Sequence, residues 1–190
     1  MNWNERYAQG DTPWEKGSAA PPLQEIVARA GKEVWGEGAV LVPGCGFGHD
    51  ARWLADRGMD TVGLDISSLA LQSARERTEG ENPRFECGDF FNAREGAYST
   101  IFEHTCFCAI DPSERKNYVT AAAQWLPVGG HLVAVFFLEP GREGGPPFGV
   151  SKLELDELFR EEFELLDEWL PAASYPGREG REWVRILRKR

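Results

Sequence analysis

Short apolar runs alternate along the chain with longer stretches in which apolar residues recur every three or four positions. The first of the runs, Ala39–Pro43, is almost wholly apolar, as a strand buried on both faces is, and Thr61–Asp65 is expected to be the second strand. The segments that follow them carry apolar residues at helical spacing. This alternation predicts a doubly wound α/β fold with a mostly parallel sheet that is covered by helices on both faces.

Seven strands are predicted in all. Because a proline- and glycine-rich turn separates the last two, we expect them to pair as a C-terminal antiparallel hairpin. The five strands beyond those already named are expected at Arg84–Cys87, Ser99–Phe107, His131–Leu138, Phe163–Trp169 and Glu182–Leu187. Helices are expected from Ser67 or Ser68 to about Arg77, from Asp111 to about Leu126, and from Ser151 onward. The irregular stretch Glu139–Val150 is a candidate active-site loop.

The length and composition fit one globular domain. At 190 residues the chain is about the size of a single domain, so residues 1–190 are expected to form one unit. Hydrophobic residues make up 42% and charged residues 27%, which excludes wholesale disorder. The longest apolar runs are too short to cross a membrane, and residues 1–6 do not resemble a secretory signal, so a cytoplasmic protein is expected.

Charge and cysteine spacing narrow the possible partners. The 31 acidic and 21 basic residues give a formal net charge of -10, which repels phosphate, so we expect neither a nucleic-acid nor a membrane partner. The cysteines form no C-x-x-C pair and the histidines show no metal-ligand spacing, so no metal site is expected. Cys106 and Cys108 are expected to be small buried residues of the fourth strand. A monomer that acts on a small molecule is favoured.

A glycine-rich turn follows the first predicted strand. Gly44, Gly46 and Gly48 stand between this strand and the next helix, where the lack of side chains lets the backbone turn sharply and approach a ligand closely. Asp65 ends the next strand 21 residues after Gly44, where a carboxylate can accept hydrogen bonds from both hydroxyls of a ribose. The pattern indicates a cofactor that contains adenosine.

Two cofactors of this kind can be weighed against each other. A nicotinamide enzyme would use the same turn, but it would need further chain for a substrate domain. Asp89 and Phe90 follow the third predicted strand, where the acid can accept a hydrogen bond from the adenine amino group and the ring can stack on the adenine face. One acid for ribose and another for adenine, without a site for a pyrophosphate, favours S-adenosylmethionine.

Five motifs spread over the chain point to one family. They are Tyr7–Gly17, Leu41–Asp50, Val62–Ser67, Phe107–Ile110 and Gly144–Ser151. In these segments the chain resembles the thiol/halide methyltransferase branch of the thiopurine S-methyltransferase family. The resemblance covers nearly the whole chain, and Thr12-Pro13-Trp14 and Gly144–Ser151 are more specific than the glycine turn. It implies the class I methyltransferase fold, which is Rossmann-like, and S-adenosylmethionine as the cofactor.

The resemblance also implies a role for each matching position. Residues 1–23 would form a lid over the cofactor through the aromatic side chains Trp3, Tyr7 and Trp14. The cofactor would further be contacted by Gly44, Gly46, Asp65, Ile66, Asp89, Phe90 and His104. The acceptor pocket would be lined by Trp14, Phe107 and Phe148, and His104 would be the catalytic residue between cofactor and acceptor. Tyr7 stands where relatives have tryptophan, and Phe148 where they have a tyrosine hydroxyl.

The reaction expected from these residues is methyl transfer to a small soft nucleophile, a thiol or hydrosulfide. A thiol of low pKa needs no general base, and the sequence offers no clear acid/base pair; His104 could orient the acceptor or take a thiol proton. A halide, a thiopurine or a selenium or tellurium species is the alternative acceptor within the same class. A protein that binds S-adenosylmethionine without turnover, such as a sensor, is the alternative from another class.

Overall fold

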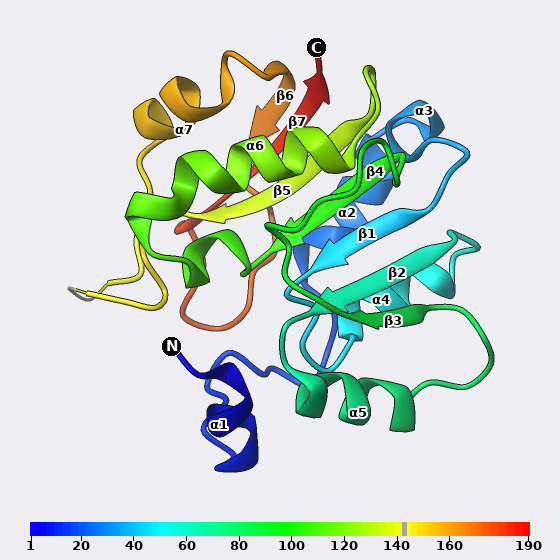
Figure 1. Cartoon of the computed structure of the whole chain (residues 1–190). Helices are drawn as coiled ribbons and strands as arrows, with labels where there is room; N and C mark the ends of the chain where they lie inside the picture. The colour runs from blue at the N-terminus through cyan, green and yellow to red at the C-terminus, as the bar shows by residue number, and fades with distance from the viewer. Residues whose placement is uncertain (142–143) are drawn as a thin grey trace.

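A seven-stranded sheet forms the centre of the computed structural model, which describes residues 1–141 and 144–190 (Figure 1). The strand order is β3-β2-β1-β4-β5-β7-β6. The strands are Val40–Pro43 (β1), Thr61–Asp65 (β2), Arg84–Cys87 (β3), Thr100–His104 (β4), His131–Phe137 (β5), Phe163–Trp169 (β6) and Glu182–Lys189 (β7). The first five are parallel, and β7 is antiparallel to both β5 and β6. The predicted fold class and the C-terminal hairpin are confirmed.

Helices cover both faces of this sheet (Figure 1). They are Trp3–Ala8 (α1), Pro22–Arg29 (α2), Lys32–Trp35 (α3), His49–Ala55 (α4), Ser68–Glu76 (α5), Arg115–Trp125 (α6) and Lys152–Phe159 (α7). Side chains of α6 and α7 belong to one hydrophobic cluster, whereas α2, α3 and α4 contribute to a second cluster on the opposite face. Strand β5 serves both, because Leu132 and Phe136 belong to the first cluster and Val133 and Val135 to the second, as the period of a strand requires.

Two predicted elements end differently in the structure. Strand β4 stops at His104, and the chain then turns into a short 3₁₀ helix, Phe107–Ala109, so the prediction of a strand through Phe107 is wrong. Glu103 stabilises this turn, because its buried carboxylate accepts a hydrogen bond from the backbone N–H of Phe107 at 2.8 Å. The helix expected from Asp111 begins as a separate 3₁₀ turn, Pro112–Glu114, before α6.

The predicted helix starts are confirmed at two serines. Ser67 Oγ accepts the N–H of Ala70 as the N-cap of α5, and Ser151 does the same for Glu154 at the start of α7. The segment Glu139–Val150 contains neither helix nor strand where the structure describes it, and two of its positions, 142 and 143, lie outside the described residues.

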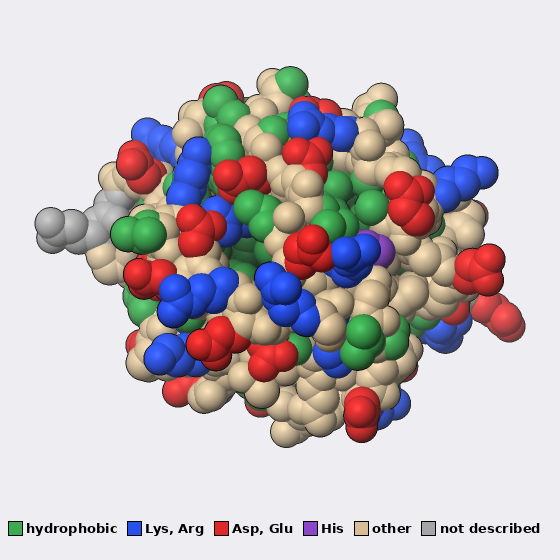
Figure 2. Space-filling view, turned by 90° about the horizontal axis from the view of Figure 1, so that it is seen from above, with side chains coloured by type: hydrophobic (Ala, Val, Ile, Leu, Met, Phe, Trp, Pro, Cys, Tyr) green, Lys and Arg blue, Asp and Glu red, His purple; other side chains and the backbone are tan. Residues whose placement is uncertain are grey.

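The carboxyl ends of the parallel strands meet at one edge, beneath which α1 lies (Figure 1). Chain connections leave β1 and β4 in opposite directions along the sheet, which opens a crevice between the ends of these two neighbouring strands. Figure 2 shows the molecule from above, on the side away from α1, with acidic and basic side chains interspersed among apolar ones, so neither sign of charge dominates that face. Within residues 1–141 and 144–190, no helix has the length and apolar character to cross a membrane.

Candidate active site

A cavity of about 640 Å³ lies at the carboxyl ends of the strands. Eight of the residues that the sequence predicts for the site line it: Trp3, Tyr7, Trp14, Gly44, Asp65, Ile66, Asp89 and Phe90. They come from the amino-terminal segment and from the loops after β1, β2 and β3. The tertiary structure therefore brings together side chains that are up to 87 residues apart in the sequence.

The glycine turn after β1 has the backbone that close approach to a ligand requires. Gly44 and Gly46 have positive φ angles of 59° and 53°, which L side chains rarely adopt. A Cβ atom on Gly44 would lie 3.0 Å from Cβ of Cys106, and one on Gly46 would lie 3.0 Å from the Tyr7 hydroxyl. Side chains here would therefore crowd the space between the turn, the lid segment and the end of β4. Gly46 itself faces a smaller adjoining cavity of about 60 Å³.

Asp65 lies at the end of β2 with its carboxylate aimed at this turn. Oδ2 accepts the backbone N–H of Gly46 and Oδ1 accepts that of Ser67, each at 2.8 Å. Burial raises the pKa of Asp65, and the hydrogen bonds from Ser67 and Gly46 oppose that rise. Because each carboxylate oxygen has a second lone pair and the residue lines the cavity, Asp65 can still accept the two hydroxyls of a ribose.

The loop after β3 provides a flat apolar wall on the far side of Asp65. Phe90 is held in place by Tyr118 of α6, whose ring stacks on it with centroids 4.8 Å apart, and its carbonyl accepts the indole N–H of Trp125 at 2.8 Å. Asp89 and Ile66 also line the cavity. An acid, an aromatic face and an aliphatic side chain together suit a purine ring, so the site fits the adenosine part of S-adenosylmethionine.

The amino-terminal segment packs on the glycine turn. Trp14 packs edge-on against Trp3 and Tyr7 with centroids 5.3 and 5.7 Å away, and its indole N–H donates to the Tyr7 hydroxyl at 3.1 Å. The Tyr7 ring in turn contacts Phe47 of the turn, 5.4 Å between centroids. Burial raises the pKa of Tyr7, and the nearby Asp65 carboxylate adds to the rise, so this hydroxyl stays protonated. The three rings of this aromatic cluster line one part of the cavity.

His104 ends β4 within a buried network of charges. Its Nδ1 lies 3.3 Å from Asp50 Oδ2 and its Nε2 lies 3.6 Å from Glu182 Oε1, while Nη1 of Arg178 contacts both Glu182 (3.2 Å) and His104 Nε2 (3.5 Å). Burial by itself lowers the pKa of His104, but hydrogen bonds and charges from Asp50 and Glu182 outweigh it and raise the pKa to about 9. The ring of Tyr175 packs alongside, 5.9 Å between centroids. His104 lines the smaller cavity and is a cation near neutral pH.

The ionisation of His104 predicts how the stability of the protein depends on pH. The folded-state pKa lies above the ordinary value of 6.5, so the stabilisation is complete below about pH 6.5 and is lost as the pH rises through about 9. We therefore expect His104→Gln to lower the free energy of unfolding most in acid and progressively less toward alkaline pH. Urea unfolding across this range measures the trend. In the control His131→Gln the trend should have the opposite sign, because burial lowers the pKa of His131.

Two residues that the resemblance assigns to the acceptor pocket, Phe107 and Phe148, do not line the main cavity. Phe107 is 1% exposed and belongs to the core between the sheet and α6, with its ring 5.1 Å from that of Tyr118 and 5.2 Å from that of Phe136. Phe148 is half-buried; its backbone N–H donates to the carbonyl of Cys108 at 2.7 Å, and its ring lies over Gly145. The neighbouring Pro146 and Pro147 are the residues of this segment that line the main cavity.

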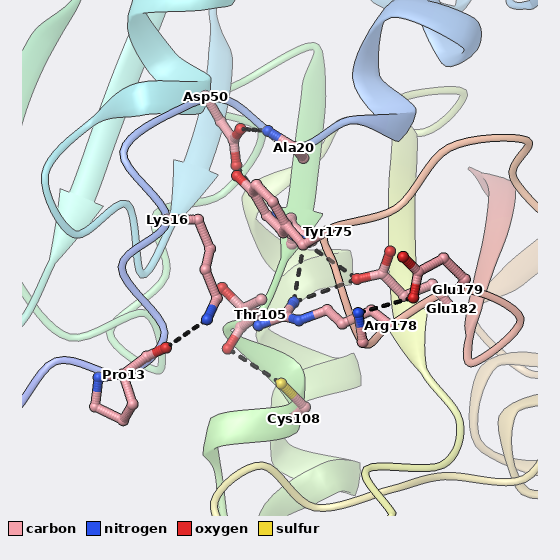
Figure 3. Close-up of polar contacts among 12 residues, drawn as sticks. Pro13, Lys16, Ala20, Asp50, Thr105, Cys108, Tyr175, Arg178, Glu179 and Glu182 are labelled. Carbon is pink, nitrogen blue, oxygen red and sulfur yellow. Dashed lines mark hydrogen bonds and ion pairs between the residues drawn. The ribbon is translucent and has the colours of Figure 1, made fainter.

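Sequence reasoning missed three residues at this end of the cavity. Arg178, from the turn region between β6 and β7, lines the cavity, and in Figure 3 its side chain extends toward Thr105. Thr105 follows β4 with a φ of 70°, an uncommon conformation for a β-branched residue. Glu103 stabilises the turn after β4 and also accepts a hydrogen bond from the Tyr118 hydroxyl at 2.7 Å. Arg178 carried no local signal in the sequence, whereas an acid inside a buried strand such as Glu103 could have been noticed.

Several solved structures with the same fold are described as methyltransferases. A 1,6-didemethyltoxoflavin-N1-methyltransferase of Burkholderia thailandensis, crystallised with S-adenosylhomocysteine, superposes with a TM-score of 0.75 over 97% of this chain and 84% of its own, at 18% identity. A TehB-like SAM-dependent methyltransferase of Corynebacterium glutamicum gives a TM-score of 0.68 over 98% of both chains, at 20% identity. At these identities the likeness establishes the fold.

Relatives found by sequence identify the family of the chain, which the structural likeness alone does not. The family model described as Thiopurine S-methyltransferase (TPMT) matches residues 1–169. A thiocyanate methyltransferase 1 of Brassica oleracea is 35% identical over 155 residues, which cover 78% of this chain and 67% of the relative. A probable thiol methyltransferase 2 of Arabidopsis thaliana is 32% identical over 161 residues, covering 82% and 70%.

The sheet order, the glycine turn with its carboxylate and this family match define an enzyme class, the S-adenosylmethionine-dependent methyltransferases of class I fold. The cavity at the strand ends fits that cofactor in size and in the chemistry of its lining. The chain belongs to the thiopurine S-methyltransferase family.

Proposed function

We propose that this enzyme transfers the methyl group of S-adenosylmethionine to a small sulfur acceptor that reaches the site as an anion, a thiolate or hydrosulfide. The observation that carries the proposal is the position of Arg178, a cation that lines the cavity together with apolar residues such as Ala109, Ile110 and Pro147. A soft anion suits both features, because the guanidinium attracts its charge while the apolar wall strips its water. The named relatives act on thiocyanate and thiols, which agrees with this acceptor class.

The protonation states around this wall argue against a reaction that begins by removing a proton. His104 is a cation near neutral pH and cannot take a thiol proton there. Burial raises the pKa of the Cys106 and Cys108 thiols, which keeps them protonated. An acceptor that is already ionised needs no base. We therefore assign to His104 the role of holding Asp50 and Glu182, and with Glu182 the guanidinium of Arg178, in place.

The chain's own residues would bind and orient both reactants. The cofactor supplies a methyl group on a sulfonium, which an anion can displace in line without further activation. Asp65 would accept hydrogen bonds from the ribose hydroxyls. Asp89, Phe90 and Ile66 would hold the adenine. The backbone at Gly44 and Gly46 would lie against the methionine part. Rigid placement of the nucleophile about 3–3.5 Å from the carbon is the main source of acceleration for such a displacement.

We further propose that residues 1–23 close the site as a lid and that Trp3, Tyr7 and Trp14 exclude water from it. Their faces would also stabilise the positive sulfonium. Phe148 would act indirectly, by positioning Cys108 of the cavity lining, because its backbone N–H donates to the carbonyl of Cys108 at 2.7 Å. A single domain, a monomer and a cytoplasmic location complete the proposal; the four free cysteines are compatible with a reducing compartment.

Formation of S-adenosylhomocysteine by the purified protein tests the acceptor class. The panel holds hydrosulfide, an aromatic thiol, thiocyanate, iodide, a thiopurine and selenide, each with S-adenosylmethionine. We expect the highest kcat/KM for hydrosulfide or the ionised thiol, with a rise in rate as the pH passes the pKa of the acceptor. Preference for iodide or the thiopurine would contradict the assignment of a small sulfur anion, as would a rate that does not depend on acceptor ionisation.

Replacement of Arg178 tests the observation on which the proposal depends. Arg178→Met keeps an unbranched apolar stem but removes the charge, so we expect kcat/KM for hydrosulfide to fall about tenfold, the value of one hydrogen bond to a charged group. Affinity for S-adenosylhomocysteine, measured by calorimetry, should stay unchanged. Arg181→Met, in the same turn region but outside the cavity lining, is the matched control. An equal loss in both variants would rule out a direct role of Arg178 at the acceptor.

A further inference from the structure

Helix α1 of the lid rests on the amino-terminal end of α5. Part of the contact is polar and is made by Asn4, whose Oδ1 accepts two hydrogen bonds from the start of α5. The donors are the Ser67 hydroxyl at 2.8 Å and the backbone N–H of Leu69 at 3.3 Å. Asn4 is therefore bonded to residues 63 and 65 positions away in the chain.

These two bonds complete the cap of α5. The first N–H groups of a helix have no partner within the helix. Ser67 Oγ accepts from Ala70 at 3.2 Å, which satisfies one of them, and Asn4 satisfies the N–H of Leu69. The Ser67 hydroxyl can cap Ala70 with its lone pairs because its own proton is given to Asn4. Opening of the lid would leave both donors at the start of α5 without this acceptor.

The same serine leads directly to the proposed ribose site. The backbone N–H of Ser67 donates to Asp65 Oδ1, and the other oxygen of Asp65 accepts from Gly46. A continuous chain of hydrogen bonds thus joins Asn4 in the lid to Asp65 in the cavity and to the glycine turn. At its other end α1 touches that turn through the Tyr7 ring on Phe47. The lid is consequently fixed to two of the loops that would hold the cofactor.

We infer that Asn4 is a positioning residue for the cofactor: it ties the closed lid to the Asp65–Ser67 turn, so that lid closure and cofactor retention are coupled. The inference rests on the proposed placement of the cofactor at Asp65 and under the lid. It extends that placement by naming the contact through which the lid acts. When the Asn4 contact is lost, the lid should open more often and bound nucleoside should leave faster.

Dissociation of S-adenosylhomocysteine, followed by stopped-flow tryptophan fluorescence, tests the coupling. We expect Asn4→Ala to release it about 3- to 10-fold faster, the value of one net hydrogen bond. Alanine favours helix formation, so a faster rate cannot come from loss of α1 itself. Asn4→Asp keeps an acceptor at a helix amino terminus and should restore the slow rate. Glu5→Ala, the same kind of change at the next, exposed position of α1, should leave the rate unaltered.

Hydrogen exchange of the Leu69 amide, measured without any cofactor, provides a second readout that does not depend on binding. Faster exchange in Asn4→Ala but not in Asn4→Asp or Glu5→Ala would support the link. Unchanged exchange, or an unchanged dissociation rate in Asn4→Ala, would overturn it. If the unaltered protein does not bind S-adenosylhomocysteine at all, the placement of the cofactor fails, and the exchange result alone then decides whether Asn4 fastens the lid to α5.

Discussion

Replacing Asp65 by alanine should weaken the binding of S-adenosylmethionine roughly 10- to 150-fold, because each hydrogen bond to a charged group contributes about 1.5–3 kcal/mol. The effect has two sources. The carboxylate is expected to accept ribose hydroxyls, and it also accepts hydrogen bonds from the N–H groups of Gly46 and Ser67. Removing it leaves the glycine turn without its anchor as well as the sugar without its partner. Isothermal calorimetry with the cofactor and with S-adenosylhomocysteine measures the loss.

A matched control lies at the other end of the same strand. Asp60 directly precedes β2 and forms an exposed ion pair with Arg84 at 2.7 Å. Asp60→Ala removes the same side chain from the same element, and exposed pairs contribute only about 0–1 kcal/mol to stability. Cofactor affinity should therefore stay near that of the unaltered protein. If Asp65→Ala bound the cofactor as tightly as Asp60→Ala, the ribose would have to lie elsewhere.

Replacing Phe107 by alanine should lower the free energy of unfolding by about 3–5 kcal/mol, the usual cost of deleting a buried aromatic side chain. The ring is 1% exposed and packs on Tyr118, Phe136 and, at 6.2 Å between centroids, Phe159. These neighbours come from the sheet, α6 and α7, so a cavity here would weaken the whole cluster on that face. Urea or thermal unfolding monitored by circular dichroism measures the change.

The same substitution distinguishes a core residue from an acceptor-binding residue. Phe91→Ala removes the same ring where it is 36% exposed and should cost far less stability. Phe107→Leu keeps most of the buried volume, so the folded variant should retain the acceptor preference of the unaltered enzyme. A changed acceptor KM in Phe107→Leu together with normal stability would favour the role that the family resemblance implies. An unchanged acceptor KM in Phe107→Leu together with a large loss of stability in Phe107→Ala would place Phe107 in the core that supports the 3₁₀ turn.

His104 shows why a residue type alone does not reveal its chemistry. In the sequence it is a histidine near the end of a strand, with an ordinary pKa near neutrality and hence a possible base. In the structure Asp50, from the start of α4, and Glu182, from the start of β7, both face it and raise its pKa to about 9. Those acids lie 54 and 78 positions away, so no local pattern could have shown them.

The pattern of residues along the chain was enough to predict the sheet, most of its strands and two residues that line the cavity, Gly44 and Asp65. Buried parallel strands are continuous apolar runs, and the turn after β1 and the acid ending β2 are tied to those strands by chain continuity, so Gly44 and Asp65 could be placed before any contact was known. The end of β4 could not be placed in this way. Thr105 to Phe107 read as a continuation of the strand, whereas in the structure the buried Glu103 accepts the N–H of Phe107 and the chain turns into a 3₁₀ helix.

The acceptor side was decided by the tertiary structure alone. Arg178 reaches the cavity because β7 inserts antiparallel between β5 and β6 and brings the preceding turn region beneath the end of β4. Asn4 caps α5 because the amino-terminal segment folds back onto the start of that helix. Such contacts depend on which elements pack together, and side-chain hydrogen bonds over many tens of residues leave no periodicity in the sequence. Elements are local properties of the chain, whereas charge networks and lid contacts exist only after those elements have packed.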